Sequence, residues 1–285
     1  MKILVTGATG FIGNHLVPRL LDRGHVVVAV ARDEEKASKL SWYSDVQFMA
    51  CDIHSAGLEF TPEQFGYPDA LVHLAWPGLP NYKALFHFED NLLADYSFIK
   101  SLVEHGLKQV LVTGTCLEYG MQNGCLTEDM PTYPANPYAL AKDTLRKFLQ
   151  SLQKTIPFTF QWIRLFYMYG AGQNPNSLLA QLDRAIETGD KQFNMSGGDQ
   201  LRDYMPVVGV ADRIASLIER VDLTGIYNCS SGAPISVRKL VESHAYEKGS
   251  SIELNLGHYP YPDYEPMAFW GDAGKFINEI NRSKS

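Results

Sequence analysis

The sequence predicts an α/β protein with a doubly wound parallel sheet, and two observations carry that prediction. A short apolar run at 3–5 leads through a glycine-spaced turn at 6–13 into a helical pattern over 14–21. Beyond it, apolar β-strand-like runs alternate with helical patterns to about residue 166, as expected for strands joined by helices. The alternation then becomes irregular. We therefore expect a Rossmann-type sheet followed by a smaller, irregular α/β C-terminal region.

The elements follow from these patterns in order. Strands are expected at 3–5, 26–31, 46–50, 71–75, 109–113 and 160–166, and helices at 14–21, 34–40, 84–104, 137–152, 177–188 and 209–220. The run 26–31 is unbroken and rich in β-branched residues, so both its faces should be covered by helices. We expect a dinucleotide-binding domain over 1–166, to which 207–230 returns. The remainder, 167–206 and 231–285, is expected to bind substrate.

Composition narrows the class of protein. The 285 residues carry a net charge of −7, which argues against nucleic acid or an anionic membrane as partner. The four cysteines and eight histidines form no metal-binding motif, so we expect no metal and reduced thiols. No apolar run reaches the roughly 18 residues of a membrane span, and a strand beginning after two residues leaves no room for a signal peptide. A soluble, cytoplasmic protein is expected.

The glycines at 7, 10 and 13 mark a ligand site. Residues without a Cβ let the backbone turn sharply and approach a ligand closely, and the N-terminus of the following helix suits a pyrophosphate. The spacing is a tighter form of the dinucleotide fingerprint. A tight turn without a ligand would use the same residues, but the preceding strand and following helix favour a dinucleotide. The residues assigned to it are Gly7, Thr9, Gly10, Phe11 and Ile12.

The end of the second strand bears on cofactor choice. An acidic residue there usually binds the ribose hydroxyls of NAD, whereas an arginine accommodates the 2′-phosphate of NADP. Ala31 stands at the acidic position and Arg32 follows, so we favour NADP(H), with NAD(H) possible. The alternative is that Arg32 is a solvated charge and Asp33 serves the ribose of NAD. Asp52, after the third strand, either accepts from the adenine amino group or caps the next turn.

Further cofactor contacts are expected where later strands end. His73 lies inside an apolar strand and is expected to be a hydrogen-bonded core residue. Trp76 either packs in the interior or forms a wall of the substrate cleft. The residues assigned to the cofactor at these strand ends are Ile53, Leu74, Ala75, Trp76 and Thr113.

Tyr138 and Lys142 carry the expected chemistry. They are four residues apart on a helix and so share one face. Both are also assigned to the cofactor, because Lys142 can donate to a nicotinamide ribose and so fix cofactor and acid together. A phenol has a pKa near 10, and we expect the Lys142 ammonium to favour the phenolate and bring the phenol toward its working range. Thr115 could hydrogen-bond the substrate oxygen while Tyr138 gives or takes its proton. An ordinary surface tyrosine and lysine would show the same spacing, but the joint occurrence with the glycine loop and Thr115 argues against that.

The chain resembles the extended short-chain dehydrogenases/reductases of the NAD-dependent epimerase/dehydratase group, which modify nucleotide sugars. The matching stretches are 6–13, 73–75, 115–120, 138–142, 164–170 and 202–204. The resemblance implies Thr115, Tyr138 and Lys142 as the catalytic set and Arg202 on the pyrophosphate, where a guanidinium suits phosphate oxygens. It also implies a homodimer through the helices at 84–104 and 138–152. The residues it implies at the sugar nucleotide are Trp76, Thr115, Cys116, Tyr138, Tyr167, Ser177, Leu178, Phe193 and Arg202.

Departures from the family pattern bear on the reaction. Family 4,6-dehydratases place Asp-Glu after the hydroxyl residue, whereas this chain has Cys116 and Leu117, so dehydration is disfavoured. Tyr167 stands where the family usually has Asn, and the expected C-terminal arginine is absent near 261–266.

Three functions remain open. The first is an NADPH-dependent reductase of a nucleotide-linked 4-keto-6-deoxyhexose, such as a dTDP-4-keto-6-deoxyhexose 4-reductase. The second is a nucleotide-sugar C4 epimerase with retained NAD, and the third a non-catalytic dinucleotide sensor. Arg32 favours the first over the second, because a net reduction consumes NADPH. The intact catalytic set counts against the third. The stretch 259–272 also resembles deoxysugar reductases, which is an argument from fold family alone.

Overall fold

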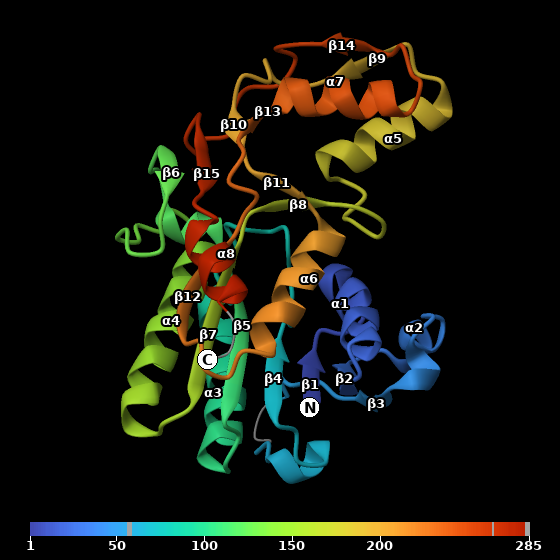
Figure 1. The fold of residues 1–285 in the computed structure, drawn as a ribbon. Helices are drawn as coiled ribbons and strands as arrows, with labels where there is room; N and C mark the ends of the chain where they lie inside the picture. The colour runs from blue at the N-terminus through green and yellow to red at the C-terminus, as the bar shows by residue number, and fades with distance from the viewer. Residues whose placement is uncertain (56–58, 264, 283–285) are drawn as a thin grey trace.

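A seven-stranded parallel sheet forms the centre of the computed structural model, which describes residues 1–55, 59–263 and 265–282 (Figure 1). The strand order is β3-β2-β1-β4-β5-β7-β12. The strands are β1 (Lys2–Thr6), β2 (Val26–Ala31), β3 (Gln47–Ala50), β4 (Ala70–His73), β5 (Gln109–Thr115), β7 (Thr159–Leu165) and β12 (Gly225–Cys229). The chain builds outward from β1 to β3 and then crosses to the other side of β1 with β4. Ligands of such sheets bind where the order reverses, outside the carboxyl ends of the strands.

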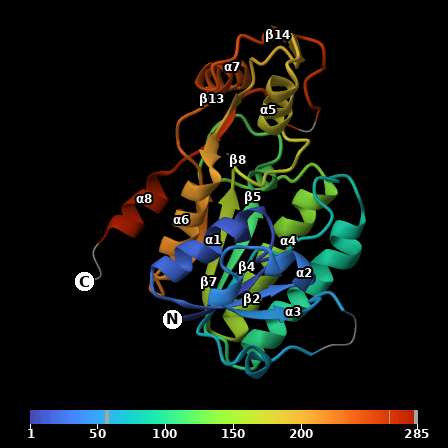
Figure 2. The same cartoon turned by 90° about the vertical axis from the view of Figure 1, so that its right-hand side faces the viewer.

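Helices cover both faces of the sheet (Figure 2). Because side chains alternate along a strand, Val27 and Ala29 join the core under α1 (Phe11–Asp22) and α6 (Val207–Ile218). Val28 and Val30 join the opposite core, which is formed with α3 (Leu92–Glu104) and α4 (Pro137–Thr155). The short helix α2 (Glu34–Ser38) follows β2. The predicted doubly wound fold is confirmed.

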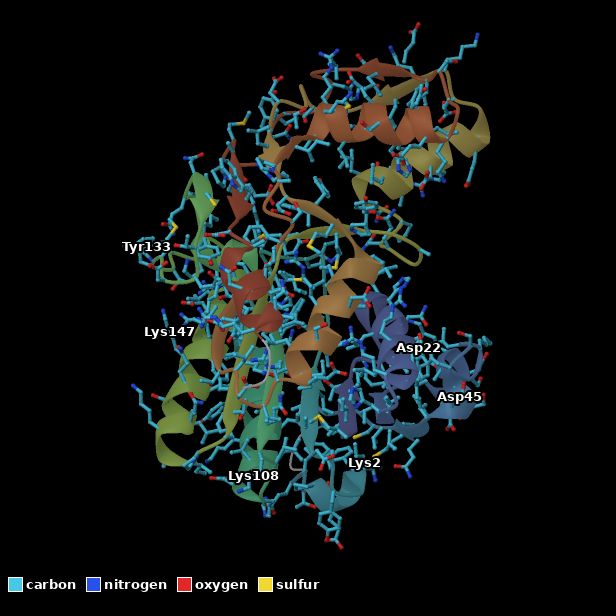
Figure 3. All side chains as sticks on the ribbon, viewed as in Figure 1. Lys2, Asp22, Asp45, Lys108, Tyr133 and Lys147 are labelled. Carbon is cyan, nitrogen blue, oxygen red and sulfur yellow. The ribbon has the colours of Figure 1, made fainter. Side chains whose placement is uncertain are left out.

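The smaller region has its own core, in which residues such as Leu182, Phe193 and Val241 are buried. It stands at the top of Figure 1, whereas Lys2, at the start of β1, and Lys108, directly before β5, mark the opposite end in Figure 3. Its elements are short and irregular: β8 (Tyr167–Tyr169), α5 (Leu178–Thr188), β9 (Gln192–Asn194), β10 (Leu201–Arg202), β11 (Tyr204–Pro206), β13 (Ile235–Ser236), α7 (Val237–Glu247) and β14 (Glu253–Asn255). The strand β15 (Phe269–Gly271) pairs with β6 (Gly124–Leu126), and α8 (Gly274–Asn281) ends the described chain. The predicted domain boundaries stay a prediction.

One helix differs from its prediction. The pattern over 84–104 predicts a single helix, but α3 is preceded by a wider π-helical turn at His87–Asn91. The amide of Asn91 donates to the carbonyl oxygen of Pro77, 3.0 Å away. His87 Nε2 lies 3.0 Å from the carbonyl oxygen of Asn81. These bonds tie the loop after β4 to the helix start. Among the described residues, no helix has both the length and the apolar character needed to cross a membrane.

Candidate active site

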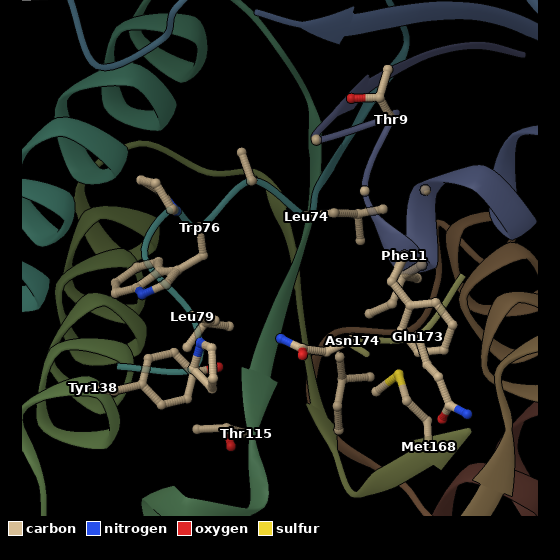
Figure 4. Close-up of a pocket in the computed structure, with 18 of the residues that line it drawn as sticks. Thr9, Phe11, Leu74, Trp76, Leu79, Thr115, Tyr138, Met168, Gln173 and Asn174 are labelled. Atoms are coloured by element: carbon tan, nitrogen blue, oxygen red, sulfur yellow. The ribbon is translucent and has the colours of Figure 1, made fainter. Parts of the chain in front are cut away.

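A cleft of about 800 Å³ runs along the carboxyl ends of the central strands and up to the smaller region. Its volume is within the range of small-molecule and cofactor sites. Figure 4 shows Thr115 and Tyr138 beside one another at one end and Thr9 at the other. The sequence-assigned residues that line the cleft are Gly7, Thr9, Gly10, Phe11, Ile12, Arg32, Asp52, Ile53, Leu74, Ala75, Trp76, Thr115, Cys116, Tyr138, Tyr167, Ser177 and Leu178. Those outside its lining are Thr113, Lys142, Phe193 and Arg202.

The glycine loop is pressed against the end of β4. Gly7 has a φ of +68°, and a Cβ there would lie 2.8 Å from the backbone nitrogen of Ala75. A Cβ at Gly13 would lie 2.5 Å from the carbonyl oxygen of Ala8. No side chain caps the N-terminus of α1 at Gly10. The loop therefore presents backbone directly to the cleft, and a helix N-terminus with no side-chain cap suits a pyrophosphate.

The expected adenosine end is lined by cations. Arg32 and Lys36 both line the cleft, and Lys36 is a residue that sequence reasoning missed. Asp33 does not line it. Its carboxylate instead accepts from the backbone nitrogen of Lys36, 2.9 Å away, and caps α2. Asp52 lines the cleft and also accepts from the backbone nitrogen of His54 at 3.1 Å, so it caps the turn while facing the site.

His73 is a buried, hydrogen-bonded histidine, as predicted. Its Nδ1 lies 2.9 Å from Thr6 Oγ1, and its Nε2 lies 3.2 Å from a carboxylate oxygen of Asp95. His54 Nε2 approaches the same oxygen to 2.7 Å. Burial alone would raise the pKa of Asp95, but the charges and hydrogen bonds of the two histidines lower it overall. This buried group links the wall of the cleft at His54 to the strand that precedes the glycine loop.

Thr115 and Tyr138 come from neighbouring elements. Thr115 ends β5, and its hydroxyl accepts from the backbone nitrogen of Leu117 at 3.3 Å. Tyr138 is the second residue of α4, which Asn136 caps by accepting from the backbone nitrogen of Ala139 at 2.9 Å. Both hydroxyl side chains therefore have fixed backbones at the same end of the cleft.

The pKa of Tyr138 moves in the direction opposite to the prediction. Burial raises it far above its ordinary value, and the hydrogen bond with Thr115 opposes that only in part. The expected lowering by Lys142 is therefore wrong for this structure, because the cost of burying a phenolate outweighs the attraction of a nearby cation. The phenol is held in its protonated form.

Lys142 lies behind Trp76. The residue is 1% exposed, and Nζ donates to the carbonyl oxygen of Thr113 at 2.9 Å. Nζ also lies 3.9 Å from the centre of the Trp76 ring, a cation–π contact. Burial lowers the pKa of Lys142 to about 8. Trp76 thus fills both roles left open by the sequence, since it lines the cleft and packs on the lysine.

The end of the cleft expected to bind substrate contains a carboxylate that sequence reasoning missed. Glu265 lines the cleft, and one of its oxygens lies 3.1 Å from the guanidinium of Arg202. The hydroxyl of Tyr167 donates to its other oxygen. Phe193 instead belongs to the core of the smaller region. No local motif marks Glu265, because its partners lie far away in the sequence.

Other cleft residues come from two loops that sequence reasoning left unassigned. The loop after β4 contributes Leu79, Pro80 and Tyr82, and the segment from β8 to α5 contributes Met168, Gln173 and Asn174. Across 1–55, 59–263 and 265–282, no three His, Cys, Asp or Glu side chains gather in a way that could hold a metal ion.

Comparison with known proteins identifies the family. The model of the NAD dependent epimerase/dehydratase family matches residues 3–230. The chain belongs to this family. It is 31% identical to the dTDP-6-deoxy-L-talose 4-dehydrogenase (NAD(+)) of Aggregatibacter actinomycetemcomitans, over 95% of this chain and 99% of that protein. It is 27% identical to the UDP-glucose 4-epimerase of Halalkalibacterium halodurans, over 90% of this chain and 83% of that protein.

A solved structure gives the same result. MoeE5 in complex with UDP-glucose and NAD matches with a TM-score of 0.83 and 26% identity, covering 98% of this chain and 92% of that one. The resemblance inferred from the motifs is therefore confirmed at the level of family and fold. The roles of individual site residues stay predictions.

Proposed function

We propose that this family member is an NADPH-dependent reductase of a nucleotide-linked 4-keto-6-deoxyhexose, such as dTDP-4-keto-6-deoxyhexose. The observation that supports it most is the joining of two features in one cleft: the Thr115 and Tyr138 hydroxyl groups at one end and the glycine loop with Arg32 and Lys36 at the other. A reductase needs both a dinucleotide site and a proton donor at the carbonyl.

The residues present fit a dinucleotide. The backbone of Leu74 and Ala75 fills the space that any Cβ at Gly7 would need, and the glycine loop leads into the uncapped N-terminus of α1, where a pyrophosphate could bind the main chain. Arg32 and Lys36 would hold a 2′-phosphate, and Asp33 is engaged as the cap of α2. The two cations after β2, with Asp33 turned to α2, favour NADP(H) over NAD(H). NAD(H) stays possible, since the 31% identical relative is named for NAD(+).

The proposed chemistry divides between cofactor and protein. A reduced nicotinamide cofactor, held by the glycine loop, Arg32 and Lys36, would supply a hydride to C4 of the sugar. Tyr138, held protonated by burial, donates its proton to the C4 oxygen as negative charge develops on it. The Thr115 hydroxyl hydrogen-bonds the same oxygen and stabilises that charge. Lys142, fixed against the Trp76 ring and the carbonyl of Thr113, is the cation next to the phenolate left behind.

The relatives support the position at which the sugar reacts. One is named a 4-dehydrogenase and another a 4-epimerase. Oxidation of a hydroxyl and reduction of the corresponding ketone are one reaction run in opposite directions, so a 4-dehydrogenase and a 4-ketoreductase need the same groups. The 4-epimerase keeps a second candidate open, namely a C4 epimerase with retained NAD. A non-catalytic sensor fits less well, because it would not need the hydroxyl pair.

We also propose a homodimer in the cytoplasm. Leu93 of α3 and Leu140 and Phe148 of α4 are exposed apolar side chains on the helices that the sequence assigns to the interface. All four cysteines are free, which fits a reducing compartment.

One assay separates the candidates. The protein is incubated with NADPH and a nucleotide-linked 4-keto-6-deoxyhexose, and NADPH absorbance and sugar products are followed. Stoichiometric loss of NADPH supports the reductase. Interconversion of C4 epimers without net loss supports the epimerase, and no turnover over a panel of nucleotide sugars contradicts both.

Variants test the assigned roles. Tyr138→Phe should lower turnover by roughly 100-fold or more with cofactor binding intact, because one general acid contributes about that much. Tyr133→Phe, at an exposed tyrosine just before α4, is the matched control. Arg32→Ala should raise the KM for NADPH by about 10-fold and leave that for NADH unchanged, as a charge-assisted bond to phosphate would be lost. Equal changes for both cofactors would mean that Arg32 does not contact a 2′-phosphate.

A further inference from the structure

The guanidinium of Arg202 is already occupied by the protein. One terminal nitrogen donates to the carbonyl oxygens of Leu201 at 2.9 Å and Met267 at 3.3 Å. The other donates to Glu265 at 3.1 Å, and the guanidinium carbon lies 4.5 Å from the centre of the Phe269 ring. The residue is 2% exposed and does not line the cleft. Arg202 therefore acts on the cleft through Glu265.

Glu265 is the charged group that faces the cleft at this end. Its side chain is 10% exposed, and it lines the cleft beside Tyr167 and Tyr204. Arg202 holds one carboxylate oxygen and the Tyr167 hydroxyl holds the other. A carboxylate has about four acceptor sites, so each oxygen keeps a lone pair for a ligand. These two partners fix a carboxylate in position and leave it able to accept.

The surroundings place this carboxylate next to the reacting end of the cleft. Tyr167, whose hydroxyl donates to Glu265, packs in the same apolar cluster as Cys116. The charge of Glu265 also adds to burial in raising the pKa of Cys116, Tyr167 and Tyr204. Cys116 directly follows Thr115, whose hydroxyl is proposed to hold the C4 oxygen. Glu265 is therefore close to the sugar ring that the proposed reaction requires.

We propose that Glu265 determines sugar specificity: its carboxylate accepts a hydrogen bond from a ring hydroxyl group of a neutral hexose, one that a 6-deoxyhexose also carries, and disfavours sugars that carry a carboxylate. Arg202 and Tyr167 are positioning residues that hold Glu265. This inference rests on the proposed function, because it assumes a nucleotide sugar in the cleft. Because Arg202 offsets part of the Glu265 charge, a second carboxylate within a few ångströms would meet a partly neutralised like charge in a poorly solvated cleft, which disfavours binding by on the order of 10-fold.

The two sequence departures at this end fit together in this scheme. Tyr167 replaces the usual Asn, and a glutamate stands in the stretch where a C-terminal arginine was expected. In the structure these residues are hydrogen-bonded to one another. A phenol can donate a hydrogen bond to a carboxylate, and a guanidinium can offset part of the carboxylate's negative charge in the folded protein. The departures thus form one arrangement.

The test measures binding to the full chain loaded with NADPH by calorimetric titration. The probes are UDP-glucose, UDP-glucuronic acid and UDP alone, with dTDP-glucose and dTDP as a second base series. The wild type should bind the glucose nucleotides about 10-fold more tightly than UDP-glucuronic acid. Glu265→Gln should remove most of that difference by tightening uronate binding, and leave binding of UDP unchanged.

Two further variants sharpen the result. Tyr167→Phe keeps the aromatic ring and removes the hydrogen bond that holds one oxygen of Glu265. The preference for UDP-glucose over UDP-glucuronic acid should therefore fall by a few-fold. Asp263→Asn removes a neighbouring carboxylate that is exposed and lies 3.7 Å from Lys83, and it should change nothing.

Equal affinity of the wild type for UDP-glucose and UDP-glucuronic acid would overturn the inference while leaving the proposed function standing. The inference would also be overturned if Glu265→Gln tightened the binding of bare UDP by the same factor as the binding of UDP-glucuronic acid. The carboxylate would then face the pyrophosphate and not the sugar. Binding of NADPH with no binding of any nucleotide sugar would overturn the proposed function as well.

Discussion

Lys142 should destabilise the fold at neutral pH. Burial lowers its pKa from the ordinary 10.5 to about 8, and each pKa unit corresponds to about 1.4 kcal/mol. The charged ammonium thus costs about 3 kcal/mol of folding free energy, from which the contact with the Trp76 ring recovers about 1 kcal/mol. Lys142→Met keeps a similar apolar stem and removes the charge. We expect it to raise the free energy of unfolding by about 2 kcal/mol at pH 7.

The pH dependence of the unfolding free energy shows that the charged form of Lys142 is the destabilising one. Because the pKa is lower in the folded state, the unfolded chain binds more protons between about pH 8 and 10.5. The loss of stability caused by the charged ammonium is therefore largest below pH 8 and decreases as the pH rises to 10.5. Urea unfolding of wild type and variant at pH 7 and pH 10 measures it. The difference in unfolding free energy between the two proteins should shrink toward zero at the higher pH, and taking that difference cancels titrations that both share.

Lys154→Met is the matched control. Lys154 is exposed in the last turn of the same helix, so its loss should change stability by less than about 0.5 kcal/mol at either pH. A Lys142→Met protein that is no more stable than the wild type at pH 7, or a difference independent of pH, would refute the reasoning. Stability gained together with lost turnover would mean that the lysine is kept for its role in the site.

Three other changes test the same structure. Gly7→Ala, at φ +68° with a new methyl group 2.8 Å from a backbone nitrogen, should weaken NADPH binding by about 10-fold or more by fluorescence titration; Gly24→Ala, at φ +78° in open space, should not. Glu118→Gln leaves the buried Arg164, now 2.7 Å from its carboxylate, without a counter-charge, and should cost about 3–5 kcal/mol in urea unfolding; a loss under about 1 kcal/mol would contradict the buried pair. Because burial raises the pKa of Tyr138, ketone reduction should stay flat in rate from pH 6 to 8 while alcohol oxidation rises with pH; reduction that falls steeply across this range would count against Tyr138 as the acid.

Local sequence patterns predicted the sheet well and its last strand poorly. The run 26–31 is apolar throughout because both faces are covered, and β2 has the same bounds. By contrast, the sequence of β12 is Gly-Ile-Tyr-Asn-Cys. The Asn228 side chain is buried there and donates a hydrogen bond to the carbonyl oxygen of Leu126. A partner about a hundred residues away makes that polar residue compatible with the interior. No local pattern contains this information.

The site divides in the same way. The glycine loop and the Tyr138 helix were predictable, because fixed spacing sets local geometry. The placement of Lys142 behind Trp76 and the pairing of Arg202 with Glu265 were not, because each depends on a partner more than sixty residues away. The predicted direction of the Tyr138 pKa shift was also wrong. A neighbouring charge can be read from spacing, whereas burial is a property of the whole fold.

Burial of the phenol bears on the choice between reductase and epimerase. At neutral pH the buried Tyr138 holds its proton, which is the form that a ketone reduction uses. An epimerase must first take a proton from the C4 hydroxyl and so needs the phenolate, the form that burial disfavours. Lys142 could supply the missing stabilisation, but burial lowers its own pKa to about 8, so its charge is also held at a cost. Burial thus keeps the proton on Tyr138 but also makes the phenol a weaker acid, so transfer of that proton to a C4 oxygen requires the charge of Lys142 to stabilise the phenolate left behind.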